Sequence, residues 1–220
     1  MAPDGWKALQ RLGASAVVRM DPSGWHGMRV GALAKAFALF REMPPLQAME
    51  IGFACELHDI GMLSVPEGVL GKQGLLNSAE RAIVMRHTDA GADMLCDDQH
   101  PRMLLARDVA RYHHARWDGS GHPDRVGGEF IPLGARICAV ADAYDAMIFG
   151  FSGREPRNME AALQELRLCA GKQFDPDIVE EFDAMIRNEM EGRGVDLGEG
   201  SGMQDFQELI QSLTEDRGFA

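Results

Sequence analysis

The chain has 220 residues, of which 45% are hydrophobic and 25% are charged, enough to bury a substantial core in one domain. Its formal net charge of -12 excludes a long polyanionic partner such as a nucleic-acid polymer, because like charges repel. The same charge argues against an anionic membrane surface as a partner. A small phosphate ester is still compatible with it, since bound metal cations can reverse the local field.

The sequence also lacks the features of exported and membrane proteins. No apolar run is long enough to cross a bilayer, and the N-terminus has no signal-peptide pattern. The cysteines are widely spaced within apolar helical patterns, which indicates reduced, buried thiols and no disulfide or zinc-finger framework. They are Cys55, Cys96, Cys138 and Cys169. We therefore expect a cytoplasmic protein.

The first clear helical pattern is an apolar stripe with steps of three, four, four and three residues. Its members are Leu46, Met49, Phe53, Leu57 and Ile60. This spacing predicts an amphipathic helix that leads into the His58-Asp59 pair. Pro44 and Pro45 stand at its start, where a missing amide is tolerated.

Helical periodicity continues through the rest of the chain. Ser78 is the expected N-cap of the next helix, with Glu80 in its first turn. The later apolar stripes are Val84, His87, Gly91 and Leu95; Leu105, Val109 and Tyr112; Leu133, Ile137, Val140, Tyr144 and Met147; and, after Asp175-Pro176, Ile178, Val179, Phe182 and Met185. No alternating pattern of useful length indicates a strand, so the expected fold class is all-α.

Composition divides the chain into a body and a short tail. Two irregular stretches are expected at residues 64–77 and 117–132, the second of them rich in glycine. Residues 192–202 shift to glycine and acidic residues, which is typical of a linker. We expect a helical domain over residues 1–191 and an amphipathic helix within residues 203–220, docked on the body or on a second copy of the chain.

Five of the seven histidines stand where a metal site would use them. They are His26, His58, His87, His113 and His114. A single histidine on an apolar helix face is usually an ordinary core residue, but these are adjacent to one another or to a carboxylate. Two neighbouring imidazoles, as in His113-His114, are costly to bury and repel each other when protonated. A metal ion removes both costs by binding them neutral.

Carboxylates complete the candidate ligand set. Asp59 follows His58 directly, and a carboxylate can bridge two cations while imidazoles fill the terminal positions, as in binuclear hydrolytic sites. Asp142 lies in an apolar helical pattern and by itself would be read as a cap or a buried ion-pair partner. His100 and His122 lie in loop segments and are weaker candidates, and His100 is expected to be solvated.

In this order and spacing, the motifs resemble the HD-GYP subgroup of the HD-domain phosphohydrolases. They are His26 with Arg29-Val30, His58-Asp59-Ile60-Gly61, His87, His113-His114, Asp118-Gly119-Ser120-Gly121-His122-Pro123 and Asp142-Ala143-Tyr144-Asp145. Each motif is weak alone, but their ordered combination is specific and runs from about residue 20 to about residue 182. The resemblance implies an HD-domain helical bundle with a binuclear metal site in its core.

The resemblance also implies which residues hold the metals. The implied ligands are His26, His58, Asp59, His87, His113, His114 and Asp142. Asp59 would be the bridging carboxylate, and His58 and Asp59 would serve catalysis through a hydroxide held between two metals. Members with a third metal use a glutamate where this chain has Pro22, with Asp21 adjacent, so two divalent ions are expected. Iron or manganese is favoured, and zinc and nickel suit the same ligands.

As an activity, the resemblance implies hydrolysis of cyclic di-GMP, or of a related cyclic dinucleotide, to the linear dinucleotide or to GMP. The implied substrate contacts are Lys72, Asp118, Gly119, Gly121, His122 and Arg154. Three departures erode this set. Met62 replaces a lysine whose contact would be worth about 1.5–3 kcal/mol, His122 replaces the tyrosine of Gly-Tyr-Pro, and Phe151 replaces the first of two arginines.

Several alternatives stay open at the level of sequence. Because the ligand set is intact, we favour an active phosphodiesterase, slow or of altered specificity. The main alternative is a sensor or scaffold that binds a cyclic dinucleotide or a protein partner without turnover. Others are a phosphohydrolase of a different nucleotide and a di-iron oxygenase, although the 118–123 loop argues against the oxygenase. A homodimer is also compatible with the sequence.

Overall fold

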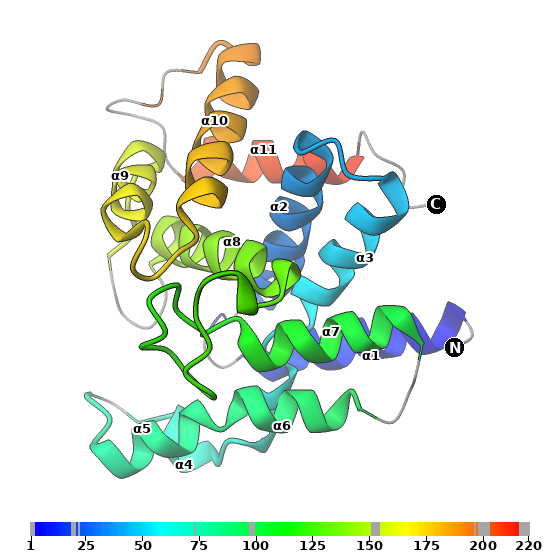
Figure 1. The fold of residues 1–220 in the computed structure, drawn as a ribbon, viewed down its shortest axis with the longest axis vertical. Helices are drawn as coiled ribbons and strands as arrows, with labels where there is room; N and C mark the ends of the chain where they lie inside the picture. Colours follow the sequence, from blue (N-terminus) through cyan, green and yellow to red (C-terminus); the bar gives the residue numbers. More distant parts are fainter. Residues whose placement is uncertain are drawn as a thin grey trace.

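A computed structural model describes residues 3–18, 21, 23–72, 74–96, 100–150, 155–195, 197 and 203–215. Within these ranges the regular secondary structure is helical, and the β-bridge between Ala170 and Phe174 is isolated, which confirms the all-α expectation (Figure 1). The helices are α1 (Pro3–Val17), α2 (His26–Phe40), α3 (Pro45–Glu56), η1 (Ile60–Ser64), α4 (Glu67–Leu70), α5 (Ser78–Met85), α6 (His87–Met94), α7 (Pro101–Tyr112), η2 (Gly128–Phe130), α8 (Leu133–Phe149), α9 (Met159–Cys169), α10 (Pro176–Gly192) and α11 (Met203–Glu215).

Helices α2 and α8 form the centre of the fold. Helix α2 packs against α3, α8 and α11, while α8 also packs against α7, α9 and α10 (Figure 1). Almost all of α2 is buried, and its many small residues let neighbours come close. A Cβ on Gly31 would lie 2.7 Å from the carbonyl oxygen of Gly52 in α3. This close approach places the start of α2 beside the end of α3, where His26 and His58 lie.

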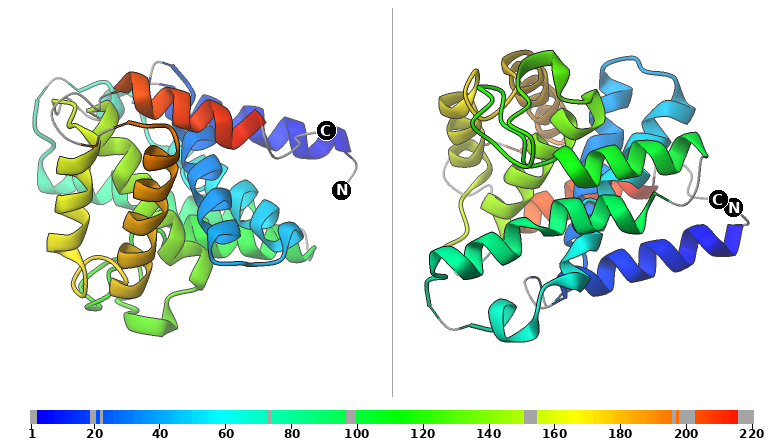
Figure 2. Two further views of the ribbon diagram at one scale, coloured as in Figure 1. Left: turned by 90° about the horizontal axis from the view of Figure 1, so that it is seen from above. Right: turned by 60° about the horizontal axis from the view of Figure 1, so that its bottom comes forward.

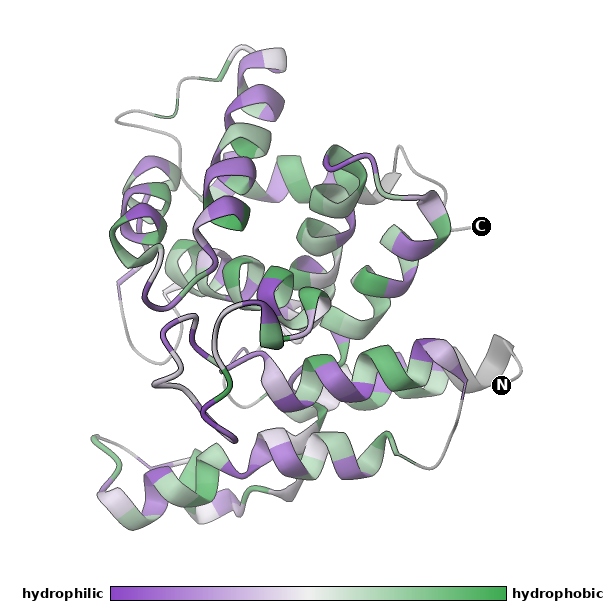
Figure 3. Ribbon diagram, in the orientation of Figure 1, coloured by the Kyte–Doolittle hydropathy of each residue, from purple (hydrophilic) through white to green (hydrophobic). Residues whose placement is uncertain are grey.

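A second layer covers one side of this core. Helix α7 packs on α3 and α6, and the short helix η1 packs between α6 and α1. Helices α4 and α5 extend from the same side (Figures 1 and 2). Coloured by hydropathy, the helices of both layers show apolar and polar faces, as expected for elements that each bury one side (Figure 3).

The predicted apolar stripe of the helix before His58 is partly wrong. Leu46 and Met49 are 62% and 43% exposed. The buried face of α3 instead contains Ala48, Ile51, Ala54 and Cys55, because α2 approaches α3 along a row of small residues. The helix also ends at Glu56. Leu57 and Ile60 are buried as predicted, but Leu57 belongs to the turn after α3 and Ile60 belongs to η1.

The boundaries around His87 differ from the prediction as well. Asn77, and not Ser78, caps α5: its side chain accepts a hydrogen bond from the Glu80 amide, and the Glu80 carboxylate accepts one from the Asn77 amide. The predicted stripe over 84–95 is divided between α5 and α6 at Arg86. His87 is consequently the first residue of α6. A short helix, α4, lies within residues 64–77, which were expected to be irregular.

The tail helix docks on its own chain. Helix α11 packs on α2 and α8, and it buries Phe206, Leu209 and Leu213. The Phe206 ring lies edge-on to Tyr144 of α8, with centroids 5.6 Å apart. The sequence was compatible with docking on the body or on a second copy of the chain, and in this structure α11 packs on the body.

The cysteine expectation holds for two of the four residues. Cys55 and Cys138 are buried, but Cys96 is exposed and Cys169 is only half-buried, because each follows or ends a surface helix. The thiols of Cys55, Cys138 and Cys169 are free. Across the described ranges, no helix combines the length and apolar character that a bilayer crossing requires.

Candidate metal centre

The seven residues proposed as metal ligands converge in the middle of the fold. They form two groups, within each of which the ligand atoms lie within 4.8 Å of one another. The groups are Asp59, His87, His113 and His114, and His26, His58 and Asp142. Most come from helix ends: α2 and α6 begin with a histidine, the His58-Asp59 pair joins α3 to η1, and the double histidine follows α7. Asp142 projects from the interior of α8.

Asp59 lies between the two groups. Its Oδ1 is 3.2 Å from His87 Nε2 and 3.5 Å from His113 Nε2, while its Oδ2 is 3.5 Å from His58 Nε2. Within the other group, Asp142 Oδ1 lies 3.2 Å from His26 Nε2. One carboxylate thus approaches imidazoles of both groups, which is the arrangement needed to bridge two cations.

Hydrogen bonds on the far side of the rings orient four of the imidazoles. The Nδ1 atoms of His58, His87 and His113 lie 2.7, 2.7 and 3.0 Å from the carbonyl oxygens of Cys55, Val84 and Ala110. His26 Nδ1 lies 2.7 Å from Asp145 Oδ2. Because a carbonyl oxygen only accepts, Nδ1 of the first three must carry the proton. Their Nε2 atoms are then free to bind a metal, as is usual for metal-ligating histidines.

The centre holds buried atoms that a cation would satisfy. His58 Nε2 and Asp59 Oδ1 are buried and have no well-aligned hydrogen bond within the described residues. In addition, His87 Nε2 and His113 Nε2 lie 3.3 Å apart. When both rings are neutral with the proton on Nδ1, these two nitrogens present lone pairs to each other, an arrangement that a bound cation would relieve. The donor set of imidazoles and carboxylates therefore fits divalent metal ions.

Electrostatics favour the neutral form of His114 and the ionised form of Asp59. Burial lowers the pKa of His114, and the neighbouring His113 and His87 lower it further, well below the ordinary value. Burial opposes ionisation of Asp59, but His58 and the other imidazoles outweigh it and hold its pKa well below the usual range. A neutral imidazole and an ionised carboxylate are the forms that ligate metal.

Burial lowers the pKa of His58 and of His87, but the Asp59 carboxylate outweighs it and raises both pKa values above the ordinary value. His26 behaves in the same way: burial lowers its pKa, yet its interactions with Asp142 and Asp145 outweigh this and raise the pKa to about 10. The metal-free site therefore favours a proton on His26. Since a cation must displace a proton from Nε2, Asp142 would pass from partner of an imidazolium to fellow ligand of a metal.

Asp145 contacts a residue of the centre, although no role was assigned to it from the sequence. It is fully buried and accepts hydrogen bonds from His26 Nδ1 and from Arg29, whose Nε and Nη2 lie 2.6 and 2.9 Å from its two oxygens. The Arg29 guanidinium also lies 3.7 Å from the centroid of the Phe149 ring. The available signal was its spacing: Asp145 follows Asp142 by three residues, so both lie on one face of α8.

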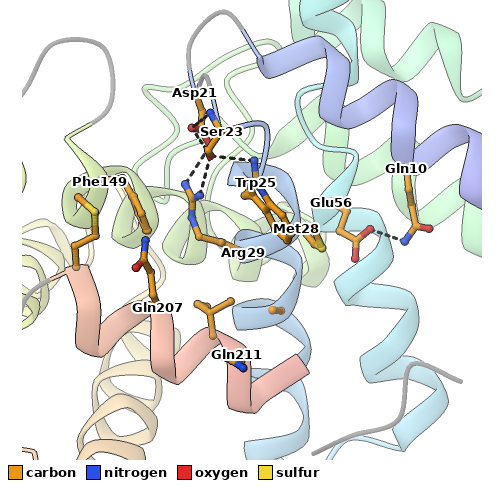
Figure 4. Close-up of a pocket in the computed structure, with 13 residues that line it drawn as sticks. Gln10, Asp21, Ser23, Trp25, Met28, Arg29, Glu56, Phe149, Gln207 and Gln211 are labelled. Carbon is orange, nitrogen blue, oxygen red and sulfur yellow. Dashed lines mark hydrogen bonds and ion pairs between the residues drawn. The ribbon is translucent and has the colours of Figure 1, made fainter. Parts of the chain in front are cut away.

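Asp21 supports the same network and is not a member of either ligand group. It accepts a hydrogen bond from the amide of His26. It also accepts one from the hydroxyl of Ser23 and lies 3.3 Å from Arg29 Nη2 (Figure 4). The Asp21 carboxylate is thereby hydrogen-bonded to the first residue of α2. Arg29 also lines a cavity of about 950 Å³ between α2 and α11, away from the ligand groups (Figure 4).

A cavity of about 380 Å³ opens beside the two ligand groups. It is lined by His113, His114, Ala115, Arg116, Ser120, Gly121, His122, Ala139, Asp142, Ala143, Gln173 and Phe174. Of the predicted substrate contacts, Gly121 and His122 thus lie at the cavity. The His122 ring is 5.1 Å from that of His114, and its buried Nε2 has no hydrogen-bond partner within the described residues.

The other predicted substrate contacts are not among the residues that line this cavity, and two of them are paired with neighbouring side chains. Lys72 forms an ion pair with Glu80 at 2.6 Å, next to α5. Asp118 is exposed and accepts hydrogen bonds from the amide and hydroxyl of Ser120, and Gly119 takes the positive φ that turns this loop. Arg154, with the departure at Phe151, falls outside the described residues. Met62 is buried in a small apolar cluster with Ala16 and Val65, and His100 is an exposed N-cap of α7.

Replacing Gly61 with alanine should displace His87, because Gly61 lies against the backbone of α6. The Cβ of an alanine there would overlap the carbonyl oxygen of His87 and lie too close to the amide nitrogen of Gly91. Both are backbone atoms, so α6 would have to move and carry His87 away from Asp59. We expect Gly61→Ala to cost at least about 1–3 kcal/mol of folding free energy and to lower metal content, measured by thermal unfolding and elemental analysis.

Gly68→Ala is the matched control for this substitution. A Cβ at Gly68 in α4 meets no atom within 4 Å, so stability and metal content should stay at the level of the unmodified chain. If the Gly61 and Gly68 variants behaved alike, the close approach of η1 to α6 would not position His87.

Comparison with known proteins identifies the family. The chain matches the HD domain family over residues 10–178. It is 38% identical over 157 residues to a cyclic di-GMP phosphodiesterase of Thermotoga maritima, covering 71% of this chain and 43% of that protein. It is 35% identical over 172 residues to the 3'3'-cGAMP-specific phosphodiesterase 2 of Vibrio cholerae, covering 78% of this chain and 33% of that protein.

A solved structure shares the fold. Bd1817, an HDG"Y"P protein from Bdellovibrio bacteriovorus, superposes with a TM-score of 0.58 at 19% identity, covering 74% of this chain and 51% of that one. The chain spans less than half the length of the two curated relatives above. The family match nevertheless covers most of this chain and contains all seven residues of the two groups. The chain therefore belongs to the HD domain family, as its resemblance to the HD-GYP subgroup predicted.

Proposed function

We propose that this chain hydrolyses a phosphodiester bond of a cyclic dinucleotide, cyclic di-GMP or 3'3'-cGAMP, with two divalent cations bound at the centre. The observation that carries the proposal is the pair of adjacent ligand groups, in which Asp59 of one group lies 3.5 Å from His58 Nε2 of the other. The names of two similar proteins, a cyclic di-GMP phosphodiesterase and a 3'3'-cGAMP-specific phosphodiesterase, supply the substrate class.

In this proposal each residue of the centre has a definite task. The two groups would hold the cations, iron or manganese, and Asp59 would be shared between them. Divalent cations supply a lowered pKa for water at the site and offset negative charge on the phosphoryl oxygens. The backbone carbonyls behind His58, His87 and His113 keep the proton on Nδ1. Asp145 holds the His26 ring in place, and Arg29 in turn holds Asp145.

The cavity beside the groups gives the substrate its place. It lies between the double histidine, the Gly121-His122 loop and Asp142, so a phosphate within it would be adjacent to residues of both groups. The His122 ring would take the position that a tyrosine has in the HD-GYP motif. Its pKa is lowered, first by burial and then by His87 and His113, so at neutral pH it offers an uncharged ring to the ligand.

One observation favours a second candidate, a slow enzyme or a binding module. Met62 replaces the lysine of the HD motif, and its side chain is buried with Ala16 and Val65. A methionine there cannot form a charge-assisted contact with phosphate. Binding of a cyclic dinucleotide without product formation would support this candidate.

Hydrolysis by the metal-loaded protein is the direct test. Protein prepared anaerobically and loaded with ferrous iron or with manganese should convert cyclic di-GMP or 3'3'-cGAMP to the linear dinucleotide or to mononucleotides. Products are followed by chromatography and metal content by elemental analysis. The chelated protein is the first control, and His100→Ala, which changes an exposed histidine outside both groups, is the second. About two metals per chain with no product from either nucleotide would contradict the proposed hydrolysis.

A further inference from the structure

The cavity beside the metal centre contains a single arginine or lysine among its lining residues, and this residue is Arg116. It follows the double histidine by two positions, so its backbone is tied to two of the ligand residues. Its side chain is 35% exposed, which leaves it accessible from solution. The same cavity wall includes His113, His114 and Asp142. Arg116 therefore brings a positive charge to the space in which a substrate would lie.

Neutral groups hold this guanidinium in place. Arg116 Nε donates to the hydroxyl of Ser120 at 2.9 Å, and Nη1 donates to Oε1 of Gln173 at 2.8 Å. The backbone supports the same arrangement, because the amide of Trp117 donates to the carbonyl oxygen of Gln173 at 3.1 Å. The side chain is thus oriented without being neutralised, and Nη2 has no hydrogen-bond partner within the described residues.

The ion pair of Arg116 leaves part of its guanidinium open. Asp118 Oδ1 is 3.7 Å from Arg116 Nε, and that oxygen already accepts two hydrogen bonds from Ser120. Two other arginines are paired more closely: Arg136 lies 2.6 Å from Asp175, and Arg111 lies 3.0 Å from Asp89. The hydrogen bonds of Arg116 instead go to Ser120 and Gln173, so its Nη2 can still donate to an anion.

We infer that Arg116 binds a phosphate of the nucleotide. The inference rests on the proposed function, since it assigns a phosphate to the same site. Arginine suits this role because its planar guanidinium can donate two parallel hydrogen bonds to phosphate oxygens. Arg116 contacts substrate in this scheme and belongs to neither ligand group.

The test compares three variants of Arg116 in the manganese-loaded protein with cyclic di-GMP as the probe. Arg116→Ala should raise KM about 10- to 100-fold, the loss expected for a charge-assisted hydrogen bond, with a smaller effect on kcat. Arg116→Gln, which can keep the hydrogen bonds to Ser120 or Gln173 but not the charge, should raise KM similarly. Arg116→Lys should recover part of the affinity, because it restores a positive charge without the bidentate geometry.

The controls separate substrate binding from a structural role. Metal content and the midpoint of thermal unfolding should be unchanged in the Arg116→Gln variant. Arg157→Ala, which removes an arginine paired with Glu165 outside the cavity, should leave KM unaltered. An active protein whose KM is the same in all Arg116 variants would overturn the assignment while the proposed function stands. A metal-loaded parent chain that neither hydrolyses nor binds cyclic di-GMP would overturn both.

Discussion

Replacing Asp59 with asparagine should leave a folded protein that retains little metal and has lost its hydrolytic activity. Asparagine has nearly the same shape but a neutral amide, so it can neither carry the bridging charge nor offer two oxygens. Because Asp59 approaches His58, His87 and His113, its loss affects both ligand groups. We expect turnover of the proposed substrate to fall by more than about 100-fold, the upper value for groups that support a metal ligand only indirectly.

The measurement combines elemental analysis after manganese loading with chromatographic assay of products. Asp108→Asn is the matched control, because Asp108 is a partly exposed carboxylate paired with Arg107 and belongs to neither group. It should retain metal and activity. Full metal content and near-normal turnover in Asp59→Asn would show that Asp59 does not bridge the two groups.

Replacing Asp145 with alanine should have the largest effect on stability. Asp145 is completely buried, and it pairs with the Arg29 guanidinium, which is only 6% exposed. Removing one partner of a buried ion pair typically costs about 3–5 kcal/mol, and here it would leave Arg29 with only the more distant Asp21, at 3.3 Å, as a counter-charge. For a chain of this size we expect the midpoint of thermal unfolding to fall by roughly 6–20 °C. Thermal unfolding followed by circular dichroism measures this directly.

A double variant tests whether the cost comes from the stranded arginine. Asp145→Ala combined with Arg29→Leu removes both charges, so it should be more stable than Asp145→Ala alone. Asp145→Asn tests the second task of the residue. It keeps the shape but loses the charge behind His26, and metal affinity should fall by about 10- to 100-fold. Unchanged metal affinity in this variant would mean that Asp145 stabilises the fold without orienting His26.

Four of the seven proposed ligands stand out in the amino-acid sequence alone because they form adjacent pairs, whereas Asp142 entered the set through the resemblance to a known family. His58-Asp59 and His113-His114 are adjacent pairs, and buried adjacent polar groups need a partner whatever surrounds them. The all-α class is equally accessible, since apolar residues recur at helical spacing along the chain. Ordered motifs then suffice to indicate the family, which the match over residues 10–178 confirms.

Tertiary packing decided what depends on residues far apart in the sequence. Leu46 and Met49 are exposed because the small residues of α2 and α3 meet along another face, which hydropathy alone does not reveal. Asp145 supports His26 from 119 positions away. Lys72 pairs with Glu80, whereas Arg116 lies in the cavity. A sequence specifies residue types and local periodicity, but the direction of a long side chain is selected by whichever partners the assembled helices bring within reach.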